Sequence, residues 1–105
     1  MFEEIIEFDE KKIAELNLDI NKINSYLDKI HDVPEIRKKS NGHYEGITSP
    51  TELAQFGNAV WACQCSEWFR KIVKRWELWE DGEFEEDIIK TTNRIEEREG
   101  RKLYE

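Results

Sequence analysis

Six apolar residues recur at alternating spacings of three and four in the first third of the chain, and this pattern constrains the fold more than any other. They are Ile13, Leu16, Ile20, Ile23, Leu27 and Ile30. A strand would alternate every second residue, so the pattern predicts a helix over about residues 9–31, with Pro34 just beyond its end. The stripe is either the inward face of the chain's own core or the seam of a homodimer, because isoleucine at most positions leaves the oligomeric state open.

Asn41-Gly42 is a strong hairpin signal within residues 35–48, because both residues tolerate a positive φ. A two-residue turn there would pair Ser40 with His43, Lys38 with Glu45 and Ile36 with Ile47. We therefore expect a small β-hairpin whose isoleucines rest on the helices, with a flexible loop as the alternative. Residues 2–8 fit either an extension of the first helix or a short strand.

The rest of the chain predicts two more helices. Ser49-Pro50-Thr51-Glu52 is a capping-box sequence that opens a long helix, and Asp81-Gly82 separates it from a third helix that stops at Gly100. The predicted fold class is mainly α, a three-helix bundle with helices over about 9–31, 50–80 and 83–99, a small β-hairpin at about 35–48, and a single domain over 1–105.

Four tryptophans lie within about 80° of arc on the predicted long helix. They are Trp61, Trp68, Trp76 and Trp79. An aromatic stripe at helical spacing is typical of a core, and large aromatic side chains also dominate protein interfaces. Trp76 and Trp79 lie nearest the end of the helix, so they are candidate partner anchors. Gly57, in the middle of the same helix, would permit a close helix crossing or a kink.

The formal net charge of −8 excludes a broad binder of nucleic acid, because phosphate backbones and anionic membranes repel such a chain. The charge is −5 over residues 1–33, +2 over 50–76 and −6 over 77–105. We therefore expect a basic central helix to pair with two acidic ones. No apolar run reaches the length of a membrane span, and the N-terminus lacks the basic start of a signal peptide, so a cytoplasmic location is expected.

The positions of the cysteines and histidines predict no metal site, no cofactor and no catalytic residue. Cys63 and Cys65 are two residues apart on a predicted helix and would point in different directions. His31 ends a predicted helix and His43 lies in the hairpin, and neither has a cysteine or histidine at ligand spacing.

Acidic residues are expected to gather at one end of the bundle. If the first two helices are antiparallel, the start of the first meets the end of the second and the start of the third. The candidate partner-binding residues are Glu77, Glu80, Asp81, Glu83, Glu85, Glu86, Asp87, Trp76, Trp79, Glu3, Glu4 and Glu7. Such a negative surface can be steered toward a basic groove, including one built to hold nucleic acid. The alternative is a solvated cluster that keeps the chain soluble.

These features favour a small, acidic, non-catalytic protein-binding module. It would act as a stoichiometric inhibitor or nucleic-acid mimic on the basic surface of a partner such as a nucleic-acid-binding enzyme, in the manner of phage proteins that act against host nucleases. One alternative is a nucleotide-binding or Mg²⁺-dependent nucleotide-hydrolysing helical protein, since Glu4/Glu7, Glu77/Glu80 and Glu83/Glu86 are paired carboxylates at a spacing of three. Another is a structural dimerisation module.

Overall fold

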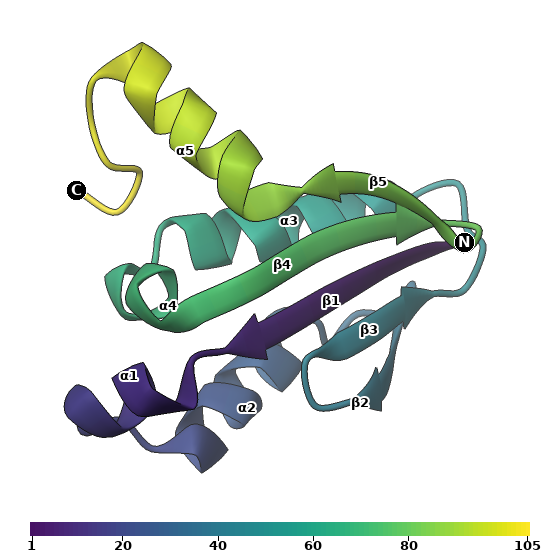
Figure 1. Ribbon diagram of the computed structural model, residues 1–105. Helices are drawn as coiled ribbons and strands as arrows, with labels where there is room; N and C mark the ends of the chain where they lie inside the picture. Colours follow the sequence, from purple (N-terminus) through teal and green to yellow (C-terminus); the bar gives the residue numbers. More distant parts are fainter.

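The chain folds around a five-stranded antiparallel sheet, so the predicted three-helix bundle is wrong. The computed structural model describes all 105 residues. The strands are β1 Phe2–Phe8, β2 Ile36–Ser40, β3 His43–Gly46, β4 Val73–Glu80 and β5 Glu83–Asp87, in the sheet order β2-β3-β1-β4-β5. The helices are α1 Glu10–Glu15, α2 Ile20–Ile30, α3 Glu52–Gln64, α4 Glu67–Ile72 and α5 Ile88–Glu99. In Figure 1, α2 and α3 lie behind the sheet, and no helix crosses the face toward the viewer.

The N-terminal segment, which the sequence leaves open as helix or strand, is the central strand β1. It pairs with β4 along its whole length, from Phe2 opposite Glu80 to Phe8 opposite Val73, and with β3 on its other side. Side chains of a strand alternate between the two faces of a sheet. Even-numbered residues of β1, such as the buried Ile6, therefore face the helices, and the odd-numbered ones face the uncovered side.

The predicted helix over residues 9–31 is two helices with a turn between them. Asn17 has a φ of 55°, and Asp19 begins α2 by accepting a hydrogen bond from the Asn21 N–H at 2.9 Å. Short polar side chains compete for backbone hydrogen bonds, so the helix stops although the apolar spacing continues. The stripe is divided into buried Ile13, Ile23 and Leu27, half-buried Ile30, and exposed Leu16 and Ile20. These residues do not form one continuous seam.

The predicted helix over residues 50–80 is interrupted at Cys65–Ser66 and is wrong from Val73 onward. The chain forms α3 and α4 and then continues as strand β4. Trp68, Ile72 and Trp76 are spaced as in a helix, but Trp76 and Leu78 alternate with outward residues as in a strand. The tryptophans are accordingly scattered: Trp76 is buried, Trp68 and Trp79 are half-buried, and Trp61 is exposed.

The predicted helix over residues 83–99 begins five residues too early, because strand β5 precedes α5. Asp81 and Gly82 have φ angles of 50° and 81°, which is the geometry of a tight two-residue hairpin turn between β4 and β5. Asp87 then caps α5 by accepting a hydrogen bond from the Lys90 N–H at 3.2 Å. The predicted stop at Gly100 is confirmed, with a φ of 70° at that glycine.

The β-hairpin predicted at residues 35–48 is present as β2 and β3, and Ser40 pairs with His43 as expected. A bulge then shifts the register by one residue. The remaining pairs are Lys38 with Tyr44, Arg37 with Glu45 and Ile36 with Gly46, in place of the predicted Lys38 with Glu45 and Ile36 with Ile47. The hairpin is not an isolated unit, because β3 joins the central strand β1.

The hydrophobic core lies between the sheet and the helices. Its main cluster is Ile6, Leu27, Ile36, Tyr44, Phe56, Cys63, Phe69, Trp76 and Ile88. Four strands supply side chains from the sheet side of this core, and four helices supply them from the other side. Burial of the sheet face and burial of the helices therefore depend on each other. None of the helices has an apolar stretch long enough to cross a lipid bilayer.

Glu52 joins α3 to β1 and provides half of the predicted capping box. Its carboxylate accepts hydrogen bonds from the Ser49 N–H at 3.0 Å and the Phe2 N–H at 2.8 Å. Burial acts to raise the pKa of Glu52, but these backbone hydrogen bonds outweigh it and hold the pKa below its usual value. The carboxylate also fills the space beside Gly46, where a Cβ atom would lie 2.5 Å from Glu52 Oε2.

Alanine at Gly46 and at Gly57 should therefore change stability in opposite directions. Gly46→Ala is expected to lower the free energy of unfolding by about 1–3 kcal/mol, because the anchored Glu52 carboxylate has to move. Gly57→Ala is expected to raise it by about 0.5–1 kcal/mol, since Gly57 is within α3 and no atom lies within 4 Å of the new methyl. Urea denaturation measures both changes, and a destabilised Gly57→Ala or an unaffected Gly46→Ala would contradict this packing.

Candidate functional site

The uncovered face of the sheet carries acidic residues that are matched by basic ones. Arg75 on β4 donates to Glu7 at 2.8 Å and to Glu77 at 3.0 Å. The hydrogen bond from Arg75 lowers the pKa of Glu77. Next to β1, His43 Nε2 lies 2.6 Å from a carboxylate oxygen of Glu3. The middle of this face is therefore a ladder of paired charges and not a field of free negative charge.

The β4–β5 hairpin differs from the middle of the sheet because it combines unpaired acids with exposed aromatic surface. Trp79 and Phe84 meet edge to face with ring centroids 5.7 Å apart, and Phe84 is 52% exposed. Trp79 Nε1 donates to Glu77 at 3.0 Å, which fixes the indole ring. We call the group of Trp79, Glu80, Asp81, Glu83, Phe84 and Glu85 the hairpin surface.

The acids of the hairpin surface are mostly free of cations. Glu83 and Glu85 are exposed, lie on the edge strand β5, and form no ion pair within 4.0 Å. Asp81 is the exception, since the N-terminal ammonium lies 2.6 Å from its carboxylate, and this hydrogen bond raises the pKa of the amine. The hairpin surface therefore keeps a net negative charge around its aromatic pair.

Some of the predicted partner-binding residues do come together, although strand pairing brings them there and not the meeting of helix ends. Antiparallel pairing of β1 with β4 places Phe2 opposite Glu80 and Glu3 opposite Trp79. The predicted region of Glu77 to Asp87 thus neighbours the start of the chain, as Figure 1 shows at the N-terminus.

Other predicted partner-binding residues lie elsewhere or serve the fold. Glu4 and Trp76 are 0% and 1% exposed, so neither belongs to a contact surface. Glu7 is paired with Arg75 at the far end of β1, and Asp87 caps α5. Glu86 accepts a hydrogen bond from the Thr91 hydroxyl at 2.7 Å.

Phe84 is not among the predicted partner-binding residues, because it falls within the helix predicted over residues 83–99. The sequence signal that indicates its position on a strand is the alternation of acidic and aromatic residues on both sides of Asp81-Gly82, which is the pattern of a hairpin.

The paired carboxylates considered for Mg²⁺ all lie on strands. Glu4 and Glu7 point to opposite faces of the sheet, as do Glu77 and Glu80, because they are three residues apart on a regular strand. A register shift pairs Glu83 with Glu80 and Glu86 with Leu78, so Glu83 and Glu86 lie on the same face. The structure brings together no group of three or more histidine, cysteine, aspartate or glutamate side chains suited to a metal ion.

A buried polar network runs through the core beneath β1. Glu4 Oε1 lies 2.6 Å from His31 Nε2, and Trp76 Nε1 donates to Glu4 Oε2 at 2.7 Å. The His31 ring stacks on Tyr44 with centroids 3.8 Å apart, and the Tyr44 hydroxyl donates to Asp28 at 2.7 Å. Burial, followed by the Asp28 hydrogen bond, raises the pKa of Tyr44. The network joins the central strand β1, the end of α2, β3 and β4.

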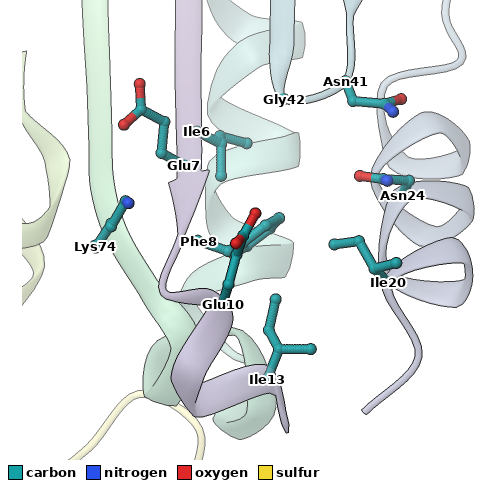
Figure 2. A pocket seen from close by; sticks show the side chains of 10 residues that line it. All are labelled: Ile6, Glu7, Phe8, Glu10, Ile13, Ile20, Asn24, Asn41, Gly42 and Lys74. Carbon is teal, nitrogen blue, oxygen red and sulfur yellow. The ribbon is translucent and has the colours of Figure 1, made fainter.

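A pocket of about 550 Å³ lies where β1 ends, between α1, α2 and the β2–β3 turn. Figure 2 shows Glu7 and Lys74 on one side of it and Asn24 and Asn41 on the other. Its apolar lining residues are Ile6, Phe8, Ile13 and Ile20. Acidic and basic side chains both line this pocket, so it presents no single charge that would select a ligand.

No protein-family model, curated protein or solved structure matches the chain.

Proposed function

We propose that the chain is a non-catalytic protein-binding module that occupies a basic surface of a partner protein, as a stoichiometric inhibitor or a mimic of nucleic acid. The observation that supports this most directly is the hairpin surface, where the exposed ring of Phe84 is flanked along β5 by the exposed Glu83 and Glu85, which form no ion pair. Negative charge steers association with a basic groove, and aromatic side chains supply most of the energy at the centre of such contacts.

The hairpin surface is suited to this role by its position. β5 is an edge strand, and no helix covers the sheet face that carries Trp79. The anchoring of Trp79 by Glu77 and Phe84 means that little side-chain freedom is lost on binding, which favours affinity.

Charge reversal on the hairpin should abolish partner capture. We compare three immobilised baits in a lysate of the source organism: the wild type, Glu83→Lys/Glu85→Lys, and the matched control Glu15→Lys/Glu97→Lys. All four glutamates are exposed and unpaired, so both variants change the net charge equally. The wild type and the control are expected to retain the same basic protein at low salt, and the hairpin variant to bind it about tenfold more weakly or not at all.

Equal retention by both variants, or capture that is insensitive to salt, would contradict the proposed function. Exposed charges act through a field that salt screens over about 8 Å at physiological ionic strength, so a contact led by charge has to weaken as salt rises.

A further inference from the structure

Among the solvent-exposed helix faces of this highly charged molecule, only that of α3 carries no charge. Residues 53–66 contain no aspartate, glutamate, lysine or arginine, although 40 of the 105 residues are of these types. The exposed residues of α3 are Leu53, Ala54, Gly57, Asn58 and Trp61. Leu53 is 50% exposed and Trp61 is 55% exposed, the highest fraction among the large apolar side chains.

α3 is apolar on both sides, which is unusual for a helix at a surface. Its inner side buries Phe56, Ala59 and Cys63 in the core, as expected. A surface helix normally presents polar and charged residues on the side that faces away from the core. A helix that is apolar all round is normally buried on both sides by other parts of a protein. The exposed Leu53 and Trp61 therefore mark a contact surface.

We infer that the outer face of α3 packs against the same face of a second copy of this chain, across a two-fold axis at Gly57. Each copy carries a net charge of −8, so two copies repel wherever charged surfaces meet. The α3 face is where two copies can approach without bringing charges together. A basic partner has no charge to attract it there, so this surface is separate from the hairpin surface and does not depend on the proposed function.

The spacing of the exposed residues is self-complementary. Leu53 and Trp61 lie four residues before and after Gly57, on the same side of the helix. A two-fold contact requires that when residue i touches residue j of the other copy, j also touches i. Two antiparallel α3 helices that cross at Gly57 meet this requirement, because Leu53 of each copy then packs against Trp61 of the other.

Gly57 allows the two backbones to come close. No heavy atom lies within 4 Å of the position of a Cβ at Gly57, so the glycine opens toward solvent and not toward the core. Small residues at a helix crossing reduce the distance between the axes and let the flanking large side chains interlock.

The contact is small, so the dimer is weak. A helix of 13 residues is about 20 Å long, and one face of it is well below the ~800 Å² per partner of a stable interface. We expect a dissociation constant of tens to hundreds of micromolar, which sets the concentrations that a test has to reach.

Sedimentation equilibrium from about 5 to 500 μM tests the inference. The average mass of the wild type is expected to rise steadily above the monomer mass toward the upper end of this range, and Trp61→Lys to remain a monomer throughout. Phe84→Lys is the matched control, because Phe84 is 52% exposed and the substitution makes the same change in charge. This control is expected to dimerise like the wild type. Both side chains are exposed, so circular dichroism should show that both variants fold.

A cysteine at the axis gives an independent readout. The amount of disulfide-linked dimer is compared after treatment with oxidised glutathione. Gly57→Cys is expected to form more of it than the wild type, in which only Cys65 is available. Glu97→Cys on α5 is expected to form no more than the wild type. A wild type that stays monomeric to 500 μM would overturn the inference. So would a dimer that survives Trp61→Lys, or one that Phe84→Lys abolishes, because either result places the contact elsewhere.

Discussion

Replacing Glu4 with leucine is expected to lower the free energy of unfolding by about 3–5 kcal/mol. The Glu4 carboxylate is 0% exposed and holds two buried partners, His31 Nε2 at 2.6 Å and the Trp76 N–H at 2.7 Å. Leucine fills the space but leaves both nitrogens without a partner in a core that excludes water. Domains of this size are stable by only about 5–15 kcal/mol, so the midpoint of urea denaturation should fall steeply.

Glu4→Gln is the matched control and should cost roughly half as much or less. His31 Nδ1 lies 2.7 Å from the Leu27 carbonyl, which can only accept, so Nδ1 carries a proton. In the tautomer that carries its proton on Nδ1, His31 has a free lone pair on Nε2. The glutamine amide can donate to that lone pair while its oxygen accepts from Trp76. Equal losses for Glu4→Leu and Glu4→Gln would show that the two hydrogen bonds do not hold β1 in place.

Protonation of Glu96 is expected to destabilise the fold by about 3 kcal/mol as the pH falls from 5 to 2. Arg70 of α4 contacts this carboxylate through two hydrogen bonds of 2.7 Å, and the Leu103 N–H donates at 2.8 Å. These bonds, led by Arg70, lower the pKa of Glu96 to about 2. A depressed folded-state pKa gives stability that is present above the unfolded value of 4.5 and is lost as the pH falls through the folded value.

Glu96→Gln should remove much of this stability at pH 7 and almost none at pH 2, so the two denaturation curves should converge in acid. Glu97→Gln is the matched control, because Glu97 is the next residue, is exposed and has no cation within 4.0 Å. Its change is expected to stay within about 0.5 kcal/mol at every pH. A difference between wild type and Glu96→Gln that stays constant with pH would refute the role of the ion pair.

Local signals predicted the parts of the fold that depend on local interactions. Asn41-Gly42 specified the β2–β3 hairpin because the turn requires a positive φ, and Gly42 adopts one of 78°. Gly100 marked the end of α5 for the same reason. The bulge that pairs Lys38 with Tyr44 could not be predicted from the local sequence, because it depends on tertiary contacts. It places Tyr44 in the core and Lys38 beside Asp28 of α2.

The sheet escaped prediction because its central pairing joins residues about 70 positions apart. β1 pairs with β4, and nothing in either segment alone shows this. The spacing of Trp68, Ile72 and Trp76 imitates a helix across the junction of α4 and β4. Asp81-Gly82 is as strong a hairpin signal as Asn41-Gly42, and residues of alternating polarity flank it. The β4–β5 hairpin could therefore have been predicted from the sequence.

The sequence shows where acidic residues cluster, but it does not show how the strands arrange them or which of them are buried. Acidic residues lie close together at the β4–β5 turn, since Glu80 and Asp81 are adjacent in the chain and Glu83 follows after Gly82. Burial could not be read from residue type. Glu4 resembled its acidic neighbours in sequence and is the most deeply buried carboxylate, whereas Phe84 resembled a core residue and is exposed.

Hydrogen–deuterium exchange on the chain bound to its captured partner tests the central claim most directly. If the hairpin surface is the contact, amides of residues 79–86 should exchange more slowly in the complex than in the free chain, and those of α2 should be unchanged. The start of β1 is expected to show weaker protection in the complex than residues 79–86, because Phe2 pairs with Glu80. Protection confined to other elements, with the exchange of residues 79–86 unaltered, would contradict the proposed function.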